Sequence, residues 1–176
     1  KWQDAYRHDL EFFAHIVDLL NLLRPEIAHD RAAVRDSLDD PHFFQLEQCE
    51  PNVAALIGAW QASGEPIVVV RHDSTSPHSP LHPDNAGNEL VEAVAAANPE
   101  LLVTKSVNSA FYGEPDLQTW LGAQGIRELV ICGIQTNMCC ETTARVGANL
   151  GFEMSFAIDA THTFDLDDHD GGTIPA

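Results

Sequence analysis

The fold is decided by the stretch Ile131-Cys-Gly-Ile-Gln-Thr-Asn-Met-Cys-Cys-Glu-Thr-Thr-Ala-Arg145. A hydrophobic run stops at Gly133, and a helical pattern begins a few residues later, so the stretch predicts a strand followed by a helix. Cys139 stands near the start of that helix, where backbone N–H groups and the positive end of the helix dipole stabilise a thiolate. The stretch therefore predicts a nucleophilic cysteine at a strand–helix junction.

The same alternation of strand and helix patterns extends along most of the chain. Strand patterns occupy residues 67–70, 101–104, 128–132 and 153–158, and helical patterns occupy residues 52–63, 88–97, 116–123 and 137–150. Strands separated by helices form parallel βαβ units with right-handed crossovers. We therefore predict an α/β three-layer sandwich, with a mostly parallel Rossmann-like sheet and helices on both faces.

The first 38 residues do not continue this pattern. Apolar residues recur at helical spacing from Leu10 to Leu23 and Pro25 ends the run, whereas residues 27–38 are charged and contain no strand-like run. We therefore divide the chain into an atypical helical N-terminal segment, residues 1–38, and a domain at residues 39–176. The N-terminal strand of the sheet is expected to be atypical or missing.

Composition and charge restrict the classes of function. The 176 residues carry a net charge of −18, which disfavours binding to nucleic acid and to anionic membranes. No apolar run is long enough to span a bilayer, and the first residues lack the pattern of a secretory signal. The four cysteines have no zinc-site spacing, so free thiols in the cytoplasm are expected.

Lys105 is the only lysine after Lys1, and a solvated surface lysine usually has companions. Its isolation indicates a specific role, because a lysine beside a thiol favours the thiolate. Polar residues also follow the ends of the predicted strands, where functional groups of parallel sheets gather. These residues are Arg71, His72, Asp73, Lys105, Gln135, Cys139 and Asp159. We expect them to converge on one crevice.

Several motifs within residues 39–165 together resemble the isochorismatase-like cysteine hydrolases. They include Lys105-Ser-Val-Asn-Ser-Ala-Phe111, Cys132-Gly-Ile-Gln-Thr-Asn-Met-Cys139 and Asp159-Ala-Thr-His-Thr-Phe164. The resemblance implies an Asp–Lys–Cys triad, in which Cys139 is the nucleophile and Lys105 holds the thiolate and orients the substrate. It also implies a non-proline cis peptide at Ile134–Gln135. The backbone N–H groups of Gln135 and Cys139 would then bind the developing oxyanion.

Three residues close to these catalytic positions are candidates for substrate binding: Asn108, Phe111 and Thr136. Two of them have a structural alternative, since Asn108 could cap or turn the chain and Phe111 could belong to the core. Both alternatives remain open at the level of sequence.

The general base is not found where the resemblance places it. The aspartate should precede Asp39 by about six residues at the end of a strand, and Ala33 occupies that position. Asp36 lies three residues late, and Asp18 has a more strand-like context but lies much earlier. Asp36, Asp18 or another carboxylate could serve as the base. The domain is also short at its C-terminal end, where the family usually continues with a last helix and strand.

No metal or cofactor is expected, although His72, Asp73, His78 and His82 are of metal-binding types. Nicotinamidases, a related branch, place a histidine two residues after the aspartate of this loop, and Thr75 stands there. We expect the loop to shape the substrate pocket or to contact another subunit.

The predicted function is hydrolysis of a C–N bond, in an amide or N-carbamoyl group of a small molecule, through a covalent thioester on Cys139. The alternatives are hydrolysis of a vinyl ether, as in the isochorismatase branch, and a catalytically impaired protein that acts in binding or assembly. The resemblance also implies a homo-oligomer, either a dimer or a tetramer.

Overall fold

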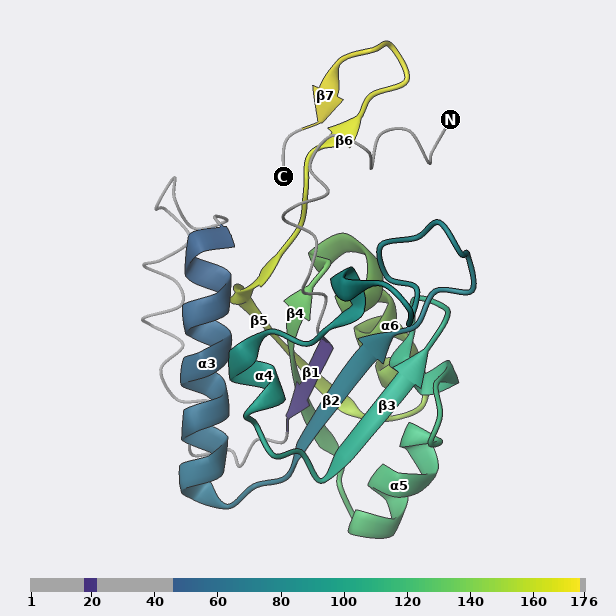
Figure 1. The fold of residues 1–176 in the computed structure, drawn as a ribbon. Helices are drawn as coiled ribbons and strands as arrows, with labels where there is room; N and C mark the ends of the chain where they lie inside the picture. Colours follow the sequence, from purple (N-terminus) through teal and green to yellow (C-terminus); the bar gives the residue numbers. More distant parts are fainter. Residues whose placement is uncertain (1–17, 22–45, 175–176) are drawn as a thin grey trace.

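The computed structural model describes residues 18–21 and 46–174, which form a five-stranded sheet with helices on both faces and a separate hairpin (Figure 1). The sheet has the order β3-β2-β1-β4-β5, and β2 pairs with β3, and β4 with β5, in parallel. Its strands are β1 (Asp18–Asn21), β2 (Ile67–His72), β3 (Leu101–Lys105), β4 (Glu128–Ile134) and β5 (Glu153–His162). The predicted α/β architecture is confirmed.

The helices lie between the strands as the sequence predicted, with some shifts of their ends. They are α3 (Leu46–Ser63), α4 (Glu92–Ala95), α5 (Leu117–Gln124) and α6 (Glu141–Asn149), with the short turns η1 (Ala86–Asn88), η2 (Ala110–Tyr112) and η3 (Thr136–Cys140). The carboxylate of Asp116 caps α5 by accepting from the Thr119 N–H, and Gly125 ends it at φ 72°. None of the described helices is long and apolar enough to cross a membrane.

The strand β1 corrects the prediction for the N-terminal segment. Helical spacing was expected from Leu10 to Leu23, but residues 18–21 form a strand that pairs antiparallel with both β2 and β4. The physical reason is tertiary, because the inner edges of β2 and β4 present backbone groups that need partners and β1 supplies them. The remainder of residues 1–38 lies outside the described residues.

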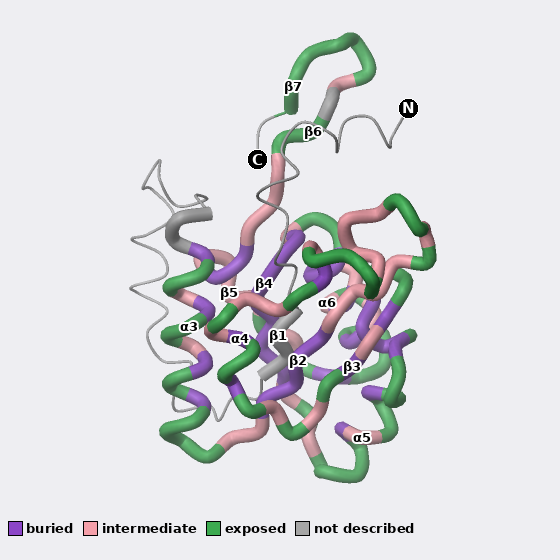
Figure 2. Tube along the Cα trace, in the orientation of Figure 1, coloured by how far each residue is buried: buried purple, intermediate pink, exposed green. Residues whose placement is uncertain are grey.

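Two hydrophobic clusters fill the layers on either side of the sheet. Alternate residues of a strand point to opposite faces, so Val69 packs with α3 and α4 while Val70 packs with α5. β4 divides in the same way, with Cys132 on the first face and Ile131 on the second. Figure 2 shows the buried residues concentrated on these central strands. Burial on both faces explains why β2 and β4 are continuous apolar runs.

The chain continues beyond β5 into a two-stranded hairpin, β6 (Leu166–Asp167) and β7 (Thr173–Ile174). In Figure 1 this hairpin projects away from the large sheet. The catalytic candidates lie on the sheet itself, and the hairpin contributes none of them.

Candidate functional site

The carboxyl ends of β2, β3 and β4 lie on the same side of the sheet, and the predicted catalytic residues lie at these ends or just after them. β2 ends at His72, β3 ends at Lys105, and β4 ends at Ile134, just before the turn that carries Cys139. β2 and β4 run in the same direction because both are antiparallel to β1. The expected convergence at the carboxyl ends of the strands is therefore present for these residues.

Lys105 and Cys139 are in direct contact. The Lys105 Nζ atom donates to the Cys139 Sγ atom at 3.2 Å, and the two residues are only 3% and 8% exposed. Water and salt screen such a buried pair much less than a surface pair. An ammonium group at this distance favours the thiolate over the thiol, which is the electrostatic condition for a cysteine nucleophile.

The turn η3 places Cys139 two residues before the N-terminal end of α6. The Gln135 carbonyl oxygen accepts from the N–H groups of Met138 and Cys140 at 3.3 and 3.1 Å, which closes a wide turn before the helix begins at Glu141. The Ile134–Gln135 peptide is cis, as the resemblance implied, and Gln135 is buried. The predicted helix at residues 137–150 is therefore a π-helical turn followed by α6.

His72 is the second side chain against Lys105. Its Nδ1 atom lies 3.5 Å from the Lys105 Nζ atom, and β2 and β3 pair these two residues directly. Burial and the positive charge of Lys105 lower the pKa of His72 to about 4, although Asp73 acts in the opposite direction. The imidazole is therefore neutral at pH 7, and a neutral ring nitrogen can accept a hydrogen bond.

A polar network fixes the loop that follows β2. The Asn88 side-chain amide donates to the carbonyl oxygens of His72 and Leu81 at 2.7 and 2.8 Å, and to the Asp73 Oδ1 atom at 3.2 Å. Arg71 binds both carboxylate oxygens of Asp73, which holds the pKa of that carboxyl below its usual value. Asn88 is buried, so these bonds attach the loop firmly to the end of β2.

This network also bears on the metal-binding alternative. The Asp73 carboxylate is already bound by Arg71 and Asn88. Within the described part of the chain, the side chains that come close enough together to hold a metal ion are those of Asp168, His169 and Asp170, and the loop histidines are not among them. The arrangement supports a structural role for the loop.

The candidate substrate-binding residues lie in different environments. Asn108 is exposed three residues after β3, and Thr136 is half-buried as the first residue of η3. Phe111 is buried in the cluster beneath α5 and stacks on Phe152 with ring centroids 5.5 Å apart. The position of Phe111 favours the core alternative, whereas Asn108 and Thr136 remain accessible.

Asp18 enters the sheet at the same edge as the catalytic candidates. Its backbone lies opposite Val70, two residues before His72, and opposite Gly133, two residues before Gln135. A carboxylate-bearing residue at the start of an antiparallel strand therefore takes a place at the carboxyl ends of its parallel neighbours. Asp36, the other candidate base, lies outside the described residues, as does Ala33.

A cavity of about 580 Å³ lies on the α3 and α4 side of the sheet. Its lining includes Cys49, Val94 and Ile134, which belong to the first hydrophobic cluster. Burial raises the pKa of Cys49 to about 12, with smaller contributions from Glu50 and Asp159, so this thiol is protonated and unreactive at pH 7. Among the described residues, neither Lys105 nor Cys139 belongs to the lining of this cavity.

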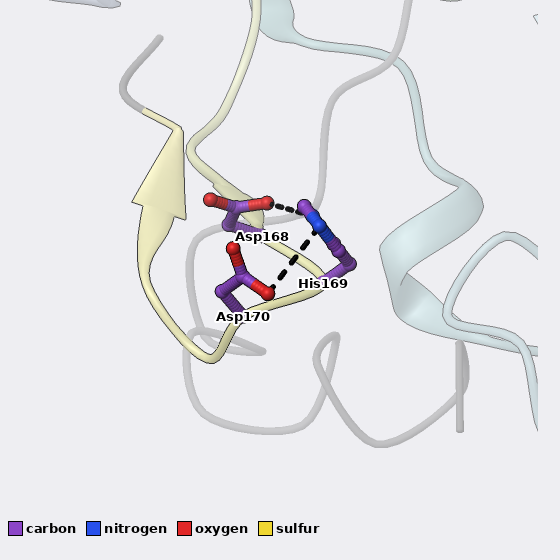
Figure 3. Close-up of side chains that lie close together, drawn as sticks. All are labelled: Asp168, His169 and Asp170. Atoms are coloured by element: carbon purple, nitrogen blue, oxygen red, sulfur yellow. Dashed lines mark hydrogen bonds and ion pairs between the residues drawn. The ribbon is translucent and has the colours of Figure 1, made fainter.

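One histidine and two aspartates lie close together in the turn of the β6–β7 hairpin (Figure 3). The His169 Nδ1 atom lies 2.6 Å from Asp168 Oδ1, and its Nε2 atom lies 3.3 Å from Asp170 Oδ1. His169 and Asp170 are exposed, and exposed polar contacts of this kind contribute little to stability. We read this cluster as local contacts within a turn.

Sequence reasoning missed two features of the site. His72 was considered only as a residue after a strand and as a possible metal ligand, and its contact with Lys105 follows from the pairing of β2 with β3. Asn88 received no predicted role. Its burial marks it as part of a hydrogen-bonded clamp, and burial of a loop asparagine is not visible in the sequence.

Comparisons with known proteins bear on the family and the fold of the chain. The isochorismatase domain model matches residues 38–173. YrdC of Bacillus subtilis, an uncharacterized isochorismatase family protein, is 35% identical over 137 residues, which cover 77% of this chain and 73% of YrdC. Nicotinamidase 3 of Arabidopsis thaliana is 31% identical over 132 residues, covering 68% of this chain and 66% of that protein. The crystal structure of a putative isochorismatase-family hydrolase from Chromobacterium violaceum superposes with a TM-score of 0.69 at 36% identity, over 80% of this chain and 73% of its own.

Proposed function

Since the chain belongs to the isochorismatase family, we propose that it is a cysteine hydrolase that cleaves a C–N bond in a small amide or N-carbamoyl compound. The observation that carries the proposal is the buried contact of 3.2 Å between Lys105 Nζ and Cys139 Sγ. A lysine and a cysteine from different strand ends, brought together away from water, form an activated nucleophile.

The proposed reaction has two stages. The Cys139 thiolate attacks the carbonyl carbon, the C–N bond breaks, and the nitrogen leaves after it receives a proton. The remaining acyl group is a thioester on Cys139. Water then attacks that carbon and loses a proton, which releases the acid and regenerates the thiolate. In both stages the oxyanion would be bound by the backbone N–H groups of Gln135 and Cys139.

We assign the proton transfers to Asp18. This assignment is supported by the register, which sets the Asp18 backbone opposite Val70 and Gly133 at the edge where His72 and Gln135 follow. A general base has to lie at the same site as the nucleophile, and Asp18 is the carboxylate-bearing residue of β1. Asp36 is the rival candidate.

The substrate would be held by Asn108 and Thr136, which are accessible and lie three positions after Lys105 and three positions before Cys139 in the chain. Phe111 would support the site from the core behind them. We expect the protein to work as a homo-oligomer in the cytoplasm, without a resident cofactor.

Two other functions compete with this proposal. Hydrolysis of a vinyl ether does not need a thiol nucleophile, and the buried Cys139–Lys105 pair favours amide chemistry. The relative named a nicotinamidase supports the same choice, since its name describes an amide-cleaving enzyme. A binding or assembly protein without catalysis would not require an activated thiol, so the contact between Cys139 and Lys105 favours the enzyme.

The test is an activity screen with matched cysteine variants. The purified protein is incubated with primary amides, N-carbamoyl compounds and a vinyl ether, and ammonia and acid products are measured. We expect turnover of an amide or N-carbamoyl compound that falls at least about 10³-fold in Cys139→Ser and survives in Cys140→Ala. Cleavage of the vinyl ether alone, or equal activity in Cys139→Ser, would contradict the proposal.

A second measurement does not depend on the choice of substrate. Alkylation of Cys139 by iodoacetamide is followed across pH by tandem mass spectrometry, which distinguishes it from Cys140. We expect alkylation to proceed well below the pH of about 8.5 at which an ordinary thiol ionises. A reaction that begins only above about pH 8 would support the non-catalytic alternative.

A further inference from the structure

We propose that His72 is a positioning residue of the site, whose neutral imidazole accepts a hydrogen bond from Lys105 and so holds the ammonium group against Cys139. The inference rests on the proposed function of Cys139 as the nucleophile and adds a residue to its machinery. His72 acts through Lys105 and has no reacting atom of its own.

The geometry places Lys105 between two acceptors. Its Nζ atom is 3.2 Å from Cys139 Sγ and 3.5 Å from His72 Nδ1. A lysine side chain has a flexible four-carbon stem and loses rotamer freedom when it is held in one place. A second acceptor beside the sulfur restricts the positions that the ammonium group can occupy. The positive charge therefore stays close to the Cys139 sulfur, where it stabilises the thiolate.

The protonation of His72 suits the role of acceptor. Burial and the positive charge of Lys105 lower its pKa to about 4, and Asp73 only partly offsets them. The Asp73 carboxylate itself is bound at both oxygens by Arg71. The ring is therefore uncharged at pH 7, whereas a charged imidazolium would repel Lys105 and could not accept from it.

The backbone around His72 is fixed on two sides. The Asn88 amide donates to the His72 carbonyl oxygen at 2.7 Å, and the Asp73 N–H donates to the Lys105 carbonyl oxygen at 2.7 Å. His72 and Lys105 are also register partners in the parallel ladder between β2 and β3. These backbone hydrogen bonds therefore fix the position of the His72 ring relative to Lys105.

The same facts argue against metal binding by His72. Metal binding would need neighbouring ligands, and the Asp73 carboxylate is already bound by Arg71 and Asn88. Support of Lys105 is the role that uses the contact His72 makes.

Three variants test this role by moving the acceptor. His72→Asn places an oxygen near the position of Nδ1, His72→Gln places one near Nε2, and His72→Leu has none. The readout is the pH profile of Cys139 alkylation, which depends on the thiolate and which a purely structural role would leave unchanged. We expect His72→Leu and His72→Gln to react about three- to tenfold more slowly at pH 7, and His72→Asn to keep the wild-type profile.

An unchanged profile in His72→Leu, or an equal loss in His72→Asn and His72→Leu, would overturn the proposal. If His72→Leu fails to fold, the comparison of His72→Asn with His72→Gln decides, since both are polar and of similar shape. The wild-type profile separates the two proposals. If Cys139 of the wild type reacts like an ordinary thiol, the proposed nucleophile is contradicted. If the thiol is activated and its profile does not change in the His72 variants, only the role of His72 is contradicted.

Discussion

The Nζ atom of Lys105 lies 3.2 Å from the Sγ atom of Cys139, although 34 positions separate the two residues in the chain. Lys105 ends β3, and Cys139 lies in the turn after β4. In the order of the sheet, β2 and β1 stand between these two strands. The contact therefore depends on the pairing of β3, β2, β1 and β4 within the sheet.

Replacement of Lys105 by methionine removes the charge and keeps most of the length of the side chain. We expect alkylation of Cys139 to require a higher pH and kcat/KM to fall at least about 100-fold, equivalent to about 2.7 kcal/mol of transition-state stabilisation. The control is Arg145→Met, because the exposed Arg145 side chain on α6 forms an ion pair with Glu141. Wild-type alkylation in Lys105→Met would show that the thiol does not depend on this ammonium group.

The general base is tested by Asp18→Asn, with Asp36→Asn as the matched variant. If Asp18 transfers the protons, Asp18→Asn should lower kcat/KM at least about 100-fold. It should leave alkylation of Cys139 at pH 7 undiminished, because alkylation needs the thiolate and not the base. Asp36→Asn should stay within about twofold of the wild type. The reverse pattern, with loss of turnover in Asp36→Asn alone, would transfer the role to Asp36.

Stability should fall in mild acid because of His72. Its pKa is 6.5 in the unfolded chain and about 4 in the folded protein, so between these values the unfolded state binds more protons. The free energy of unfolding therefore decreases as pH falls from about 6.5 towards 4. After allowance for the partial exposure of the ring, the loss is about 1–2 kcal/mol. Urea unfolding at pH 7 and pH 4.5 should show a smaller decrease in His72→Asn, and equal decreases would contradict this assignment.

A pair of glycines predicts opposite effects on stability. A Cβ atom at Gly113 would lie 2.5 Å from Val103 Cγ1 and 2.7 Å from the Thr104 carbonyl oxygen, whereas a Cβ atom at Gly122 meets nothing within 4 Å. Gly113→Ala should destabilise the protein by about 1–3 kcal/mol through overpacking against β3. Gly122→Ala lies in α5 and should stabilise it by about 0.5–1 kcal/mol. Urea unfolding measures the free energy of unfolding of both variants. An unchanged free energy in Gly113→Ala would contradict the prediction and would mean that β3 shifts to make room for the added methyl group.

Local signals in the sequence were sufficient to predict the position of Cys139 and most of the sheet. The strand–glycine–helix pattern placed Cys139 at a strand–helix junction, and the isolation of Lys105 marked it as a candidate site residue, which the structure places against Cys139. Continuous apolar runs identified β2 and β4, because strands buried on both faces leave that pattern. Each of these signals is carried by neighbouring residues within one element.

The features that sequence reasoning missed depend on pairing between distant strands. β1 has apolar residues at helical spacing around it, and it becomes a strand because β2 and β4 both offer it backbone partners. The contact between His72 and Lys105 depends on a register that a shift of one residue would destroy. For Phe111 the sequence left substrate binding and the core both open, and its ring packs against Phe152 in the core.

The position of β1 has a consequence for the contact between Lys105 and Cys139. β2 and β3 carry His72 and Lys105, β4 leads into the turn with Cys139 and pairs with β5, and four residues of β1 provide the ladder that joins these two halves of the described sheet. Displacement of β1 would let the halves separate and would break the lysine–thiol contact without altering any catalytic side chain. The reactivity of Cys139 is therefore also a measure of whether this short strand is in place.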